Sequence, residues 1–329
     1  MIKIALFIAL YFAIGVFILN AGIQFLSKTL LNIGEKHMKP VLLSYTKNTF
    51  SSFLSGFTLS VLLQGSTPVM LCTISLIHAR MMSFYNSLGI IYGANLGTTL
   101  SAVLMSYSPR YSQYFILALG LLLKAFLRKG KLKYTGDILL SVGLIYVGIG
   151  VLNLSMPLFR EQMMRSSLWT RYADRIYVPL ILSVFITAVT HSSAAVTAVT
   201  ILLFKEGIVG KGAVIAIILG SNLGTCITAQ IASFNTEKEA VKMAWANTMY
   251  NLVGCLAGLV FLNPFHDFLE GTIRLFRIPS DFFPAVCHIV VNLLSAIVFI
   301  PLTKPYYRFI NKIVGKGKQR GKQKRHLLY

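Results

Sequence analysis

Long apolar runs alternate with short polar segments along this 329-residue chain. Six runs contain no Asp, Glu, Lys or Arg and reach the ~20 residues that a helix needs to cross about 30 Å of hydrocarbon. They cover 5–27, 83–109, 138–159, 212–236, 243–265 and 282–303. A shorter run over 111–127 is interrupted only by Lys124, whose side chain can reach the membrane surface. The pattern predicts an all-α polytopic membrane protein with about seven full spans.

Two further apolar runs each carry a polar cluster near the middle. The clusters are Gln64, Gly65, Ser66 and Thr67 in the run 48–79, and His191, Ser192 and Ser193 in the run 176–204. As straight helices the runs would be about 48 and 44 Å long. That is too long for one untilted span. Two spans need about 40 residues, which is more than either run contains. We predict a re-entrant hairpin in each run, with Gly65 and Pro68 supplying the first turn. The alternative is a single tilted helix.

Two motifs recur in order, which indicates an internal duplication. "GANLGTT" at 93–99 returns as "GSNLGTC" at 220–226, which is 127 positions further on. The same shift carries "QGSTPV" (64–69) onto "HSSAAV" (191–196). In the first helix of each half, Gly15 and Gly22 correspond to Gly143 and Gly150 at a shift of 128.

The duplication divides the chain into two repeats and a C-terminal extension. The first repeat, 1–134, has a helix, the hairpin 48–79, a broken helix 83–107 and a helix 111–127; the second, 135–265, has a helix, the hairpin 176–204, a broken helix 212–233 and a helix 239–262. A transmembrane helix over 282–303 and a basic tail over 304–329 follow. Three spans per repeat would turn the second repeat upside down, as in the inverted repeats of secondary transporters.

The net charge of +21 has its densest part in the tail, where 304–325 carries nine basic residues and no acidic one. Basic segments beside a last helix mark the cytoplasmic side and contact anionic lipid, so no nucleic acid is expected as partner. We predict a multi-pass protein of the cell membrane with a cytoplasmic C-terminus and an outside N-terminus. The basic segment 128–133 then lies inside, as does a first loop that begins at Lys28. Four arginines between 160 and 175 fall outside, which is an exception to the enrichment of basic residues on the cytoplasmic side.

The two tips could bind an anion, because the first N–H groups of a half-helix carry partial positive charge. Ser66 and Thr67 in one half, and Ser192 and Ser193 in the other, add hydroxyl donors. Gln64 and His191 are the matching positions just before. A tetrahedral oxyanion could be held in this way without a lysine or an arginine.

The "GxNLGT" segments suggest a cation site, because glycines beside an asparagine permit local unwinding. Hard oxygen ligands for Na⁺ would come from Asn95, Thr98, Thr99, Asn222, Thr225 and Thr228. No carboxylate lies deep in a predicted span, so we expect no metal beyond Na⁺ and no other cofactor. The competing interpretation is that these small and hydroxyl residues only pack helices together.

Two helices carry polar pairs four residues apart, Asn247 with Asn251 and His288 with Asn292. Such pairs either hydrogen-bond between helices or line a cavity. A hydrolase is the weakest reading, because His191 and its neighbouring serines do not face one another on a helix. No acid is placed to orient the imidazole. We therefore expect no enzyme.

Taken together, the paired tips, the paired "G-A/S-N-L-G-T" motifs, the glycine-rich helices at 11–22 and 141–150 and the "AxxHxxxN" pattern resemble the type II sodium/phosphate cotransporter family from about residue 5 to 302. The resemblance implies Na⁺-coupled symport of inorganic phosphate. The implied site consists of Gln64, Ser66, Thr67, Ser192, Ser193, Asn95, Thr98, Thr99, Asn222 and Thr225. The expected partners are phosphate, Na⁺ and lipids, with a homodimer and a separate PhoU-like regulator as open options.

Departures from the family pattern leave alternatives open. A serine-rich "QSSS" has become Gln64-Gly65-Ser66-Thr67 in one half and His191-Ser192-Ser193-Ala194 in the other. Histidine side chains titrate near neutral pH, unlike the amide that His191 replaces. Another oxyanion, proton coupling, export, or a non-transporting sensor or assembly protein on the same scaffold therefore remain alternatives.

Overall fold

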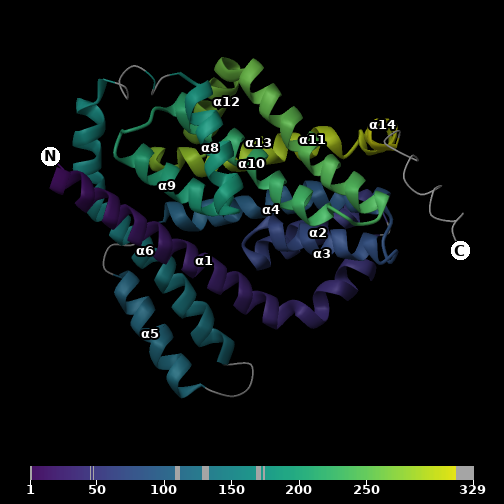
Figure 1. Ribbon diagram of the computed structural model, residues 1–329, viewed down its shortest axis with the longest axis horizontal. Helices are drawn as coiled ribbons and strands as arrows, with labels where there is room; N and C mark the ends of the chain where they lie inside the picture. The colour runs from purple at the N-terminus through teal and green to yellow at the C-terminus, as the bar shows by residue number, and fades with distance from the viewer. Residues whose placement is uncertain are drawn as a thin grey trace, which may run out of the picture.

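A computed structural model describes residues 2–44, 46, 48–107, 112–127, 133–167, 172 and 175–315 of the chain (Figure 1). Every regular element in these ranges is a helix, which confirms the all-α prediction. The elements are α1 (Ile2–Ser44), α2 (Thr49–Leu63), α3 (Ser66–His78), α4 (Phe84–Ser106), α5 (Ser112–Phe126), α6 (Lys133–Arg165), α8 (Tyr177–Thr190), α9 (Ser193–Lys205), α10 (Lys211–Ser233), α11 (Lys238–Val260), α12 (Leu262–Leu275), the 3₁₀ turn η1 (Ser280–Phe282), α13 (Phe283–Phe299) and α14 (Thr303–Gly315). Residues 128–132 of the predicted basic segment, Arg171 and residues 316–329 lie outside the described residues.

Five helices in the described ranges are long and apolar enough to cross a membrane. The number is six if α11 and α12, which meet at 91°, form one span. The predicted span 111–127 forms α5, whose 15 residues are about 22 Å long. That is shorter than a hydrocarbon layer of about 30 Å. The chain is a multi-pass membrane protein, and the count of seven spans stays a prediction.

Each predicted hairpin divides into two helices at its polar cluster. α2 gives way to α3 at Gln64 and Gly65. α8 gives way to α9 at His191 and Ser192. Gln64 and His191 both adopt the left-handed conformation, each with φ of 53°. The two breaks therefore have the same backbone geometry at positions 127 apart, while their re-entrant course through a membrane stays a prediction.

The first break does not depend on Gly65 and Pro68 as we predicted. Gly65 has φ of 173°, an extended backbone that any residue can adopt, and Pro68 lies in the first turn of α3. The left-handed residue is Gln64, and its counterpart His191 forms the same break in a half without Gly or Pro at the tip. A left-handed residue other than Gly costs about 1–2 kcal/mol, so surrounding contacts must hold both positions.

The predicted broken helices are continuous, which corrects a second expectation. α4 runs unbroken through 93–99, and α10 runs unbroken through 220–226. The glycines instead permit close packing: a Cβ atom on Gly97 would lie 2.5 Å from the Phe57 carbonyl oxygen of α2. A Cβ atom on Gly224 would lie 2.6 Å from the Val184 carbonyl oxygen of α8. Each tip is thus anchored by its preceding helix against α4 or α10.

The glycine-rich first helices of the two halves pack against each other. A Cβ atom on Gly22 of α1 would lie 2.8 Å from the Ile145 backbone nitrogen of α6. A Cβ atom on Gly148 of α6 would lie 2.5 Å from the Leu19 backbone nitrogen of α1. α5 and the first half of α6 project together away from the remaining helices (Figure 1). α1 therefore runs along the body of the molecule, beside both breaks.

Candidate functional site

Both helix breaks line one cavity of about 610 Å³, together with α1. Its lining includes all seven predicted anion-binding residues: Gln64, Gly65, Ser66, Thr67, His191, Ser192 and Ser193. Of the six predicted Na⁺ ligands, Thr98 also lines this cavity. Among the described residues that line it there is no Asp or Glu. The structure therefore brings together tips that are 127 positions apart in sequence, in a space that holds several polar side chains and, among its described lining, no carboxylate.

The two tips present their first helical turns differently. Ser192 accepts a hydrogen bond from the Ala195 backbone N–H at 3.2 Å and so caps α9. Gly65, the matching residue of α3, offers no side-chain cap. The residue that matches Ala195 is Pro68, which has no N–H to be capped. The N–H groups of Ser66 and Thr67 thus remain for an external acceptor, since the first N–H groups of a helix have no intrahelical partner.

The residues just before the tips make matched contacts in the two halves. The Ser101 hydroxyl of α4 donates to Gln64 Oε1 at 3.0 Å. His191 Nδ1 and the Thr228 hydroxyl of α10 lie 2.9 Å apart in the equivalent contact. These bonds hold the left-handed residues of both breaks against α4 and α10. Thr228, which we assigned to Na⁺, is therefore already paired with the second tip.

Three predicted Na⁺ ligands surround a small hollow behind the first tip. Asn95, Thr225 and Thr228 line it together with the tip residues Ser66 and Thr67, and Asn247 and apolar side chains of α3 and α10 complete the wall. The hollow has a volume of about 10 Å³, close to the space of a single water-sized sphere. Its oxygens come from both halves of the chain, which is a donor set that suits a hard monovalent cation.

The asparagines of the two "GxNLG" motifs belong to a buried network of hydrogen bonds. Asn95 Nδ2 donates to Asn247 Oδ1 at 3.1 Å, and Asn251 Nδ2 lies 3.3 Å from the same oxygen. Asn222 Oδ1 lies 3.0 Å from His288 Nε2. Asn247 and Asn251 of α11 and His288 of α13 therefore join helices, which is the first of the two roles that we predicted for these pairs. The Asn292 side chain donates to the His288 carbonyl of its own helix. Asn247 also lines the hollow, so it has the second predicted role, that of lining a cavity, as well.

The remaining predicted ligands differ in their surroundings. The Thr98 hydroxyl lies 3.0 Å from the Ser60 hydroxyl of α2 and donates to the Ala94 carbonyl at 2.9 Å. The Thr99 hydroxyl donates to the Leu96 carbonyl at 2.7 Å and lines neither the cavity nor the hollow. Asn222, which is paired with His288, also lines neither space. Thr99 and Asn222 are thus the two predicted ligands that lie apart from the cavity and the hollow.

Sequence reasoning missed the contribution of α1 to the cavity. Asn20 and three further residues of α1 line the cavity and form a polar stripe on one face of the helix; the three are Gln24, Ser27 and Lys28. We had placed Lys28 in a first loop, because the uncharged run ends at residue 27. α1 instead continues to Ser44. The helical spacing of these four residues was the signal that could have found the stripe.

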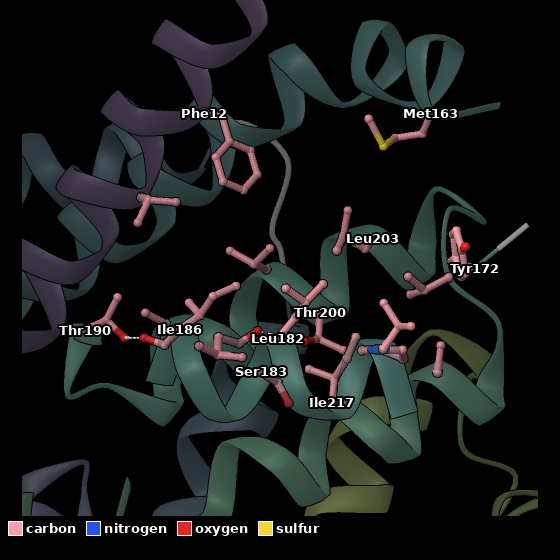
Figure 2. A pocket seen from close by; sticks show the side chains of 18 of the residues that line it. Phe12, Met163, Tyr172, Leu182, Ser183, Ile186, Thr190, Thr200, Leu203 and Ile217 are labelled. Atoms are coloured by element: carbon pink, nitrogen blue, oxygen red, sulfur yellow. Dashed lines mark hydrogen bonds between the residues drawn. The ribbon is translucent and has the colours of Figure 1, made fainter. Parts of the chain in front are cut away.

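A larger cavity of about 730 Å³ lies between α8, α9 and α10 and reaches α1 and α6. Phe12 and Met163 face it from one side, and Leu182 and Leu203 face it from the other (Figure 2). Its hydroxyl groups on α8 and α9 donate to carbonyls of their own helices, in Ser183, Thr190 and Thr200. This cavity offers little to an anion, so the smaller polar cavity is the better candidate site.

Comparison with known families fits this arrangement. A model of the family described as "Na+/Pi-cotransporter" matches residues 6–154 and 157–261, which include both breaks and all the described lining of the cavity. The match defines the class of protein, a membrane transporter. The chain belongs to the Na⁺/Pi-cotransporter family.

Two curated relatives differ in how much of their length the chain spans. "Uncharacterized protein YqeW" of Bacillus subtilis (strain 168) is 28% identical over 299 residues, which cover 89% of this chain and 94% of the relative. "Putative inorganic phosphate export protein YjbB" of Escherichia coli (strain K12) is 20% identical over 263 residues, which cover 80% of this chain. The chain spans about half of that relative, 48% of its length. No solved structure matches the chain.

Proposed function

We propose that the chain is a secondary transporter that couples the movement of inorganic phosphate to Na⁺. The observation that carries this proposal is the cavity lined by both helix breaks, with hydroxyl groups, helix N-termini and no carboxylate among its described lining. Helix N-termini and hydroxyl donors suit a phosphate ion. Family membership and the name of the Escherichia coli relative support phosphate as the substrate.

In the proposed mechanism, the tips bind phosphate between Ser66 and Thr67 on one side and Ser192 and Ser193 on the other. Na⁺ binds in the hollow lined by Asn95, Thr225 and Thr228, next to the first tip. Because the hollow and the cavity share Ser66 and Thr67, cation and anion would attract one another across a short distance. Each ion thereby raises the affinity for the other, which is the coupling that symport requires.

The direction of transport follows from the gradients, since a coupled carrier runs either way. The family description names cotransport, whereas the Escherichia coli relative is named for export. Radiolabelled phosphate flux in proteoliposomes tests both cases, with the Na⁺ gradient imposed inward and then outward. We expect phosphate to follow the Na⁺ gradient in each orientation. Flux that ignores Na⁺ would contradict the coupling, and no flux under any gradient would contradict transport.

Replacing Ser66 by Asp tests the tip directly. Ser66 is buried, and the new carboxylate would lie where the first N–H groups of α3 face the cavity. Ser66→Asp should abolish phosphate binding by the purified protein, because the fixed negative charge repels the anion. Normal binding by this variant would exclude the first tip as the site.

We further propose that the two repeats are inverted in the cell membrane, with the C-terminus in the cytoplasm. The base of the first hairpin meets the end of α10, because Arg80 pairs with Glu237 at 3.1 Å. The base of the second hairpin leads directly into the start of α10 at Lys211. α10 is about 34 Å long, so these contacts support entry of the two hairpins from opposite faces.

Proton coupling is a second candidate, favoured by His191 at the second tip. The imidazole contacts Thr228 and lines the cavity, and histidine side chains can change charge between pH 5 and 8. Phosphate flux driven by a pH gradient in Na⁺-free proteoliposomes would support it. The same flux surviving in His191→Gln would contradict a role for this residue.

A further inference from the structure

A lysine of the first helix faces the candidate anion cavity. Lys28 lies on α1 with Asn20, Gln24 and Ser27, and all four residues line the cavity opposite the two tips. Asn20 and Lys28 are two turns apart, so the stripe is about 12 Å long. Asn20 Oδ1 is buried without a hydrogen-bond partner among the described residues. The third wall of the cavity is therefore polar and contains a positive charge.

The charge of Lys28 has no counter-ion in the described part of the chain. Three other lysines there are paired with acids, namely Lys124 with Asp137, Lys211 with Glu270 and Lys242 with Glu239. Lys28 forms no such ion pair with a described Asp or Glu. Its side chain is exposed to an open cavity whose other titratable described lining residue is His191. The positive charge is thus free to meet a solute.

We propose that Lys28 is the charge partner of the oxyanion and sets the preference of the site for a doubly charged phosphate. The two tips offer hydroxyl and N–H dipoles, which stabilise any oxyanion but add no full charge. An ammonium group adds a charge-assisted hydrogen bond, which favours the dianion over the monoanion. Gln24, one turn away on the same face, provides a neutral donor beside it. This inference rests on the proposed phosphate site and adds α1 to it.

Phosphate binding by the purified full-length protein in phosphatidylcholine nanodiscs tests the assignment. Inorganic phosphate is the probe, at pH 6 and at pH 8, where the fraction of dianion differs. Lys28→Gln should weaken binding at pH 8 roughly 10-fold or more, the effect of losing a hydrogen bond to a charged group. The loss at pH 6 should be smaller. Lys28→Arg keeps the charge and should stay close to wild type. Lys304→Gln removes an equally exposed charge on α14, outside the cavity lining, and should change nothing.

The outcomes separate this inference from the proposed function. If the wild type binds phosphate, Ser66→Asp does not, and Lys28→Gln binds normally at both pH values, Lys28 is not the charge partner. If Lys28→Gln binds phosphate normally but loses retention of phosphatidylglycerol in mixed nanodiscs, the lysine serves a lipid headgroup and the assignment is overturned. If the wild type binds no phosphate, the proposed function and this inference both fail. A Lys28→Gln variant that elutes as an aggregate is replaced by Lys28→Met, with the same expectations.

Discussion

At the scale of single residues, the two tips reach the same backbone geometry with different chemistry. Gln64 and His191 share φ of 53°, and each contacts a hydroxyl of the following long helix. The sequence could predict where the chain breaks, because the polar clusters match at a constant shift. It could not predict that the left-handed residue is Gln64 instead of Gly65, because a glycine three residues before a proline signals a turn regardless of which residue bears the strain.

The caps of α3 and α9 lead to a prediction for stability. Ser192→Ala removes the side chain that accepts from the Ala195 N–H, so it should lower the free energy of unfolding by about 1 kcal/mol. Gly65→Ala is the matched control and should be nearly neutral. Its new Cβ atom meets only Pro68 Cδ, at 4.0 Å. Thermal unfolding of the detergent-purified protein measures both, and equal destabilisation would contradict the difference between the caps.

At the scale of elements, glycines in the long helices serve packing. The apolar runs predicted α4 and α10 well, yet the "GxNLGT" motifs do not unwind. A glycine that permits unwinding and one that admits a neighbouring backbone look the same in a sequence. Lys28 was misplaced for a related reason, because a charged residue at the end of an apolar run does not say whether the helix stops there. Only the contacts of α2, α8 and α1 decide these cases.

Packing against α8 predicts the effect of a methyl group on α10. A Cβ atom on Gly224 would lie 2.6 Å from the Val184 carbonyl oxygen, so Gly224→Ala should destabilise the protein by roughly 1–3 kcal/mol. Gly212 lies in the same helix with open space around it, so Gly212→Ala should be neutral or slightly stabilising. A thiol-reactive dye that labels buried Cys226, Cys255 and Cys287 on heating reports unfolding. Equal melting temperatures for the two variants would contradict the close approach of α8.

At the scale of the whole molecule, matched contacts 127 positions apart extend the sequence repeat into three dimensions. Gly97 meets the backbone of Phe57, and Gly224 meets the backbone of Val184 in the same way. The sequence could predict the repeat and the pairing of the tips. It could not predict that α1 forms the third wall of the cavity, because the polar residues of α1 belong to none of the repeated motifs.

The proposed inversion predicts that the hairpin bases lie on opposite sides of the membrane. Single cysteines at Arg80 and Glu206, in a background without the native cysteines, can be labelled with a membrane-impermeant thiol reagent in intact cells. Arg80→Cys should be protected until the cells are opened, whereas Glu206→Cys should react from outside. Labelling of both from the same side would contradict inverted repeats.

The most direct test is the structure of the protein determined with phosphate and Na⁺ bound. It should show the anion in the cavity between the tips, within hydrogen-bonding distance of Ser66 and Ser193 together. An anion held by one tip alone, or bound outside this cavity, would contradict the central claim that the two breaks form a single phosphate site.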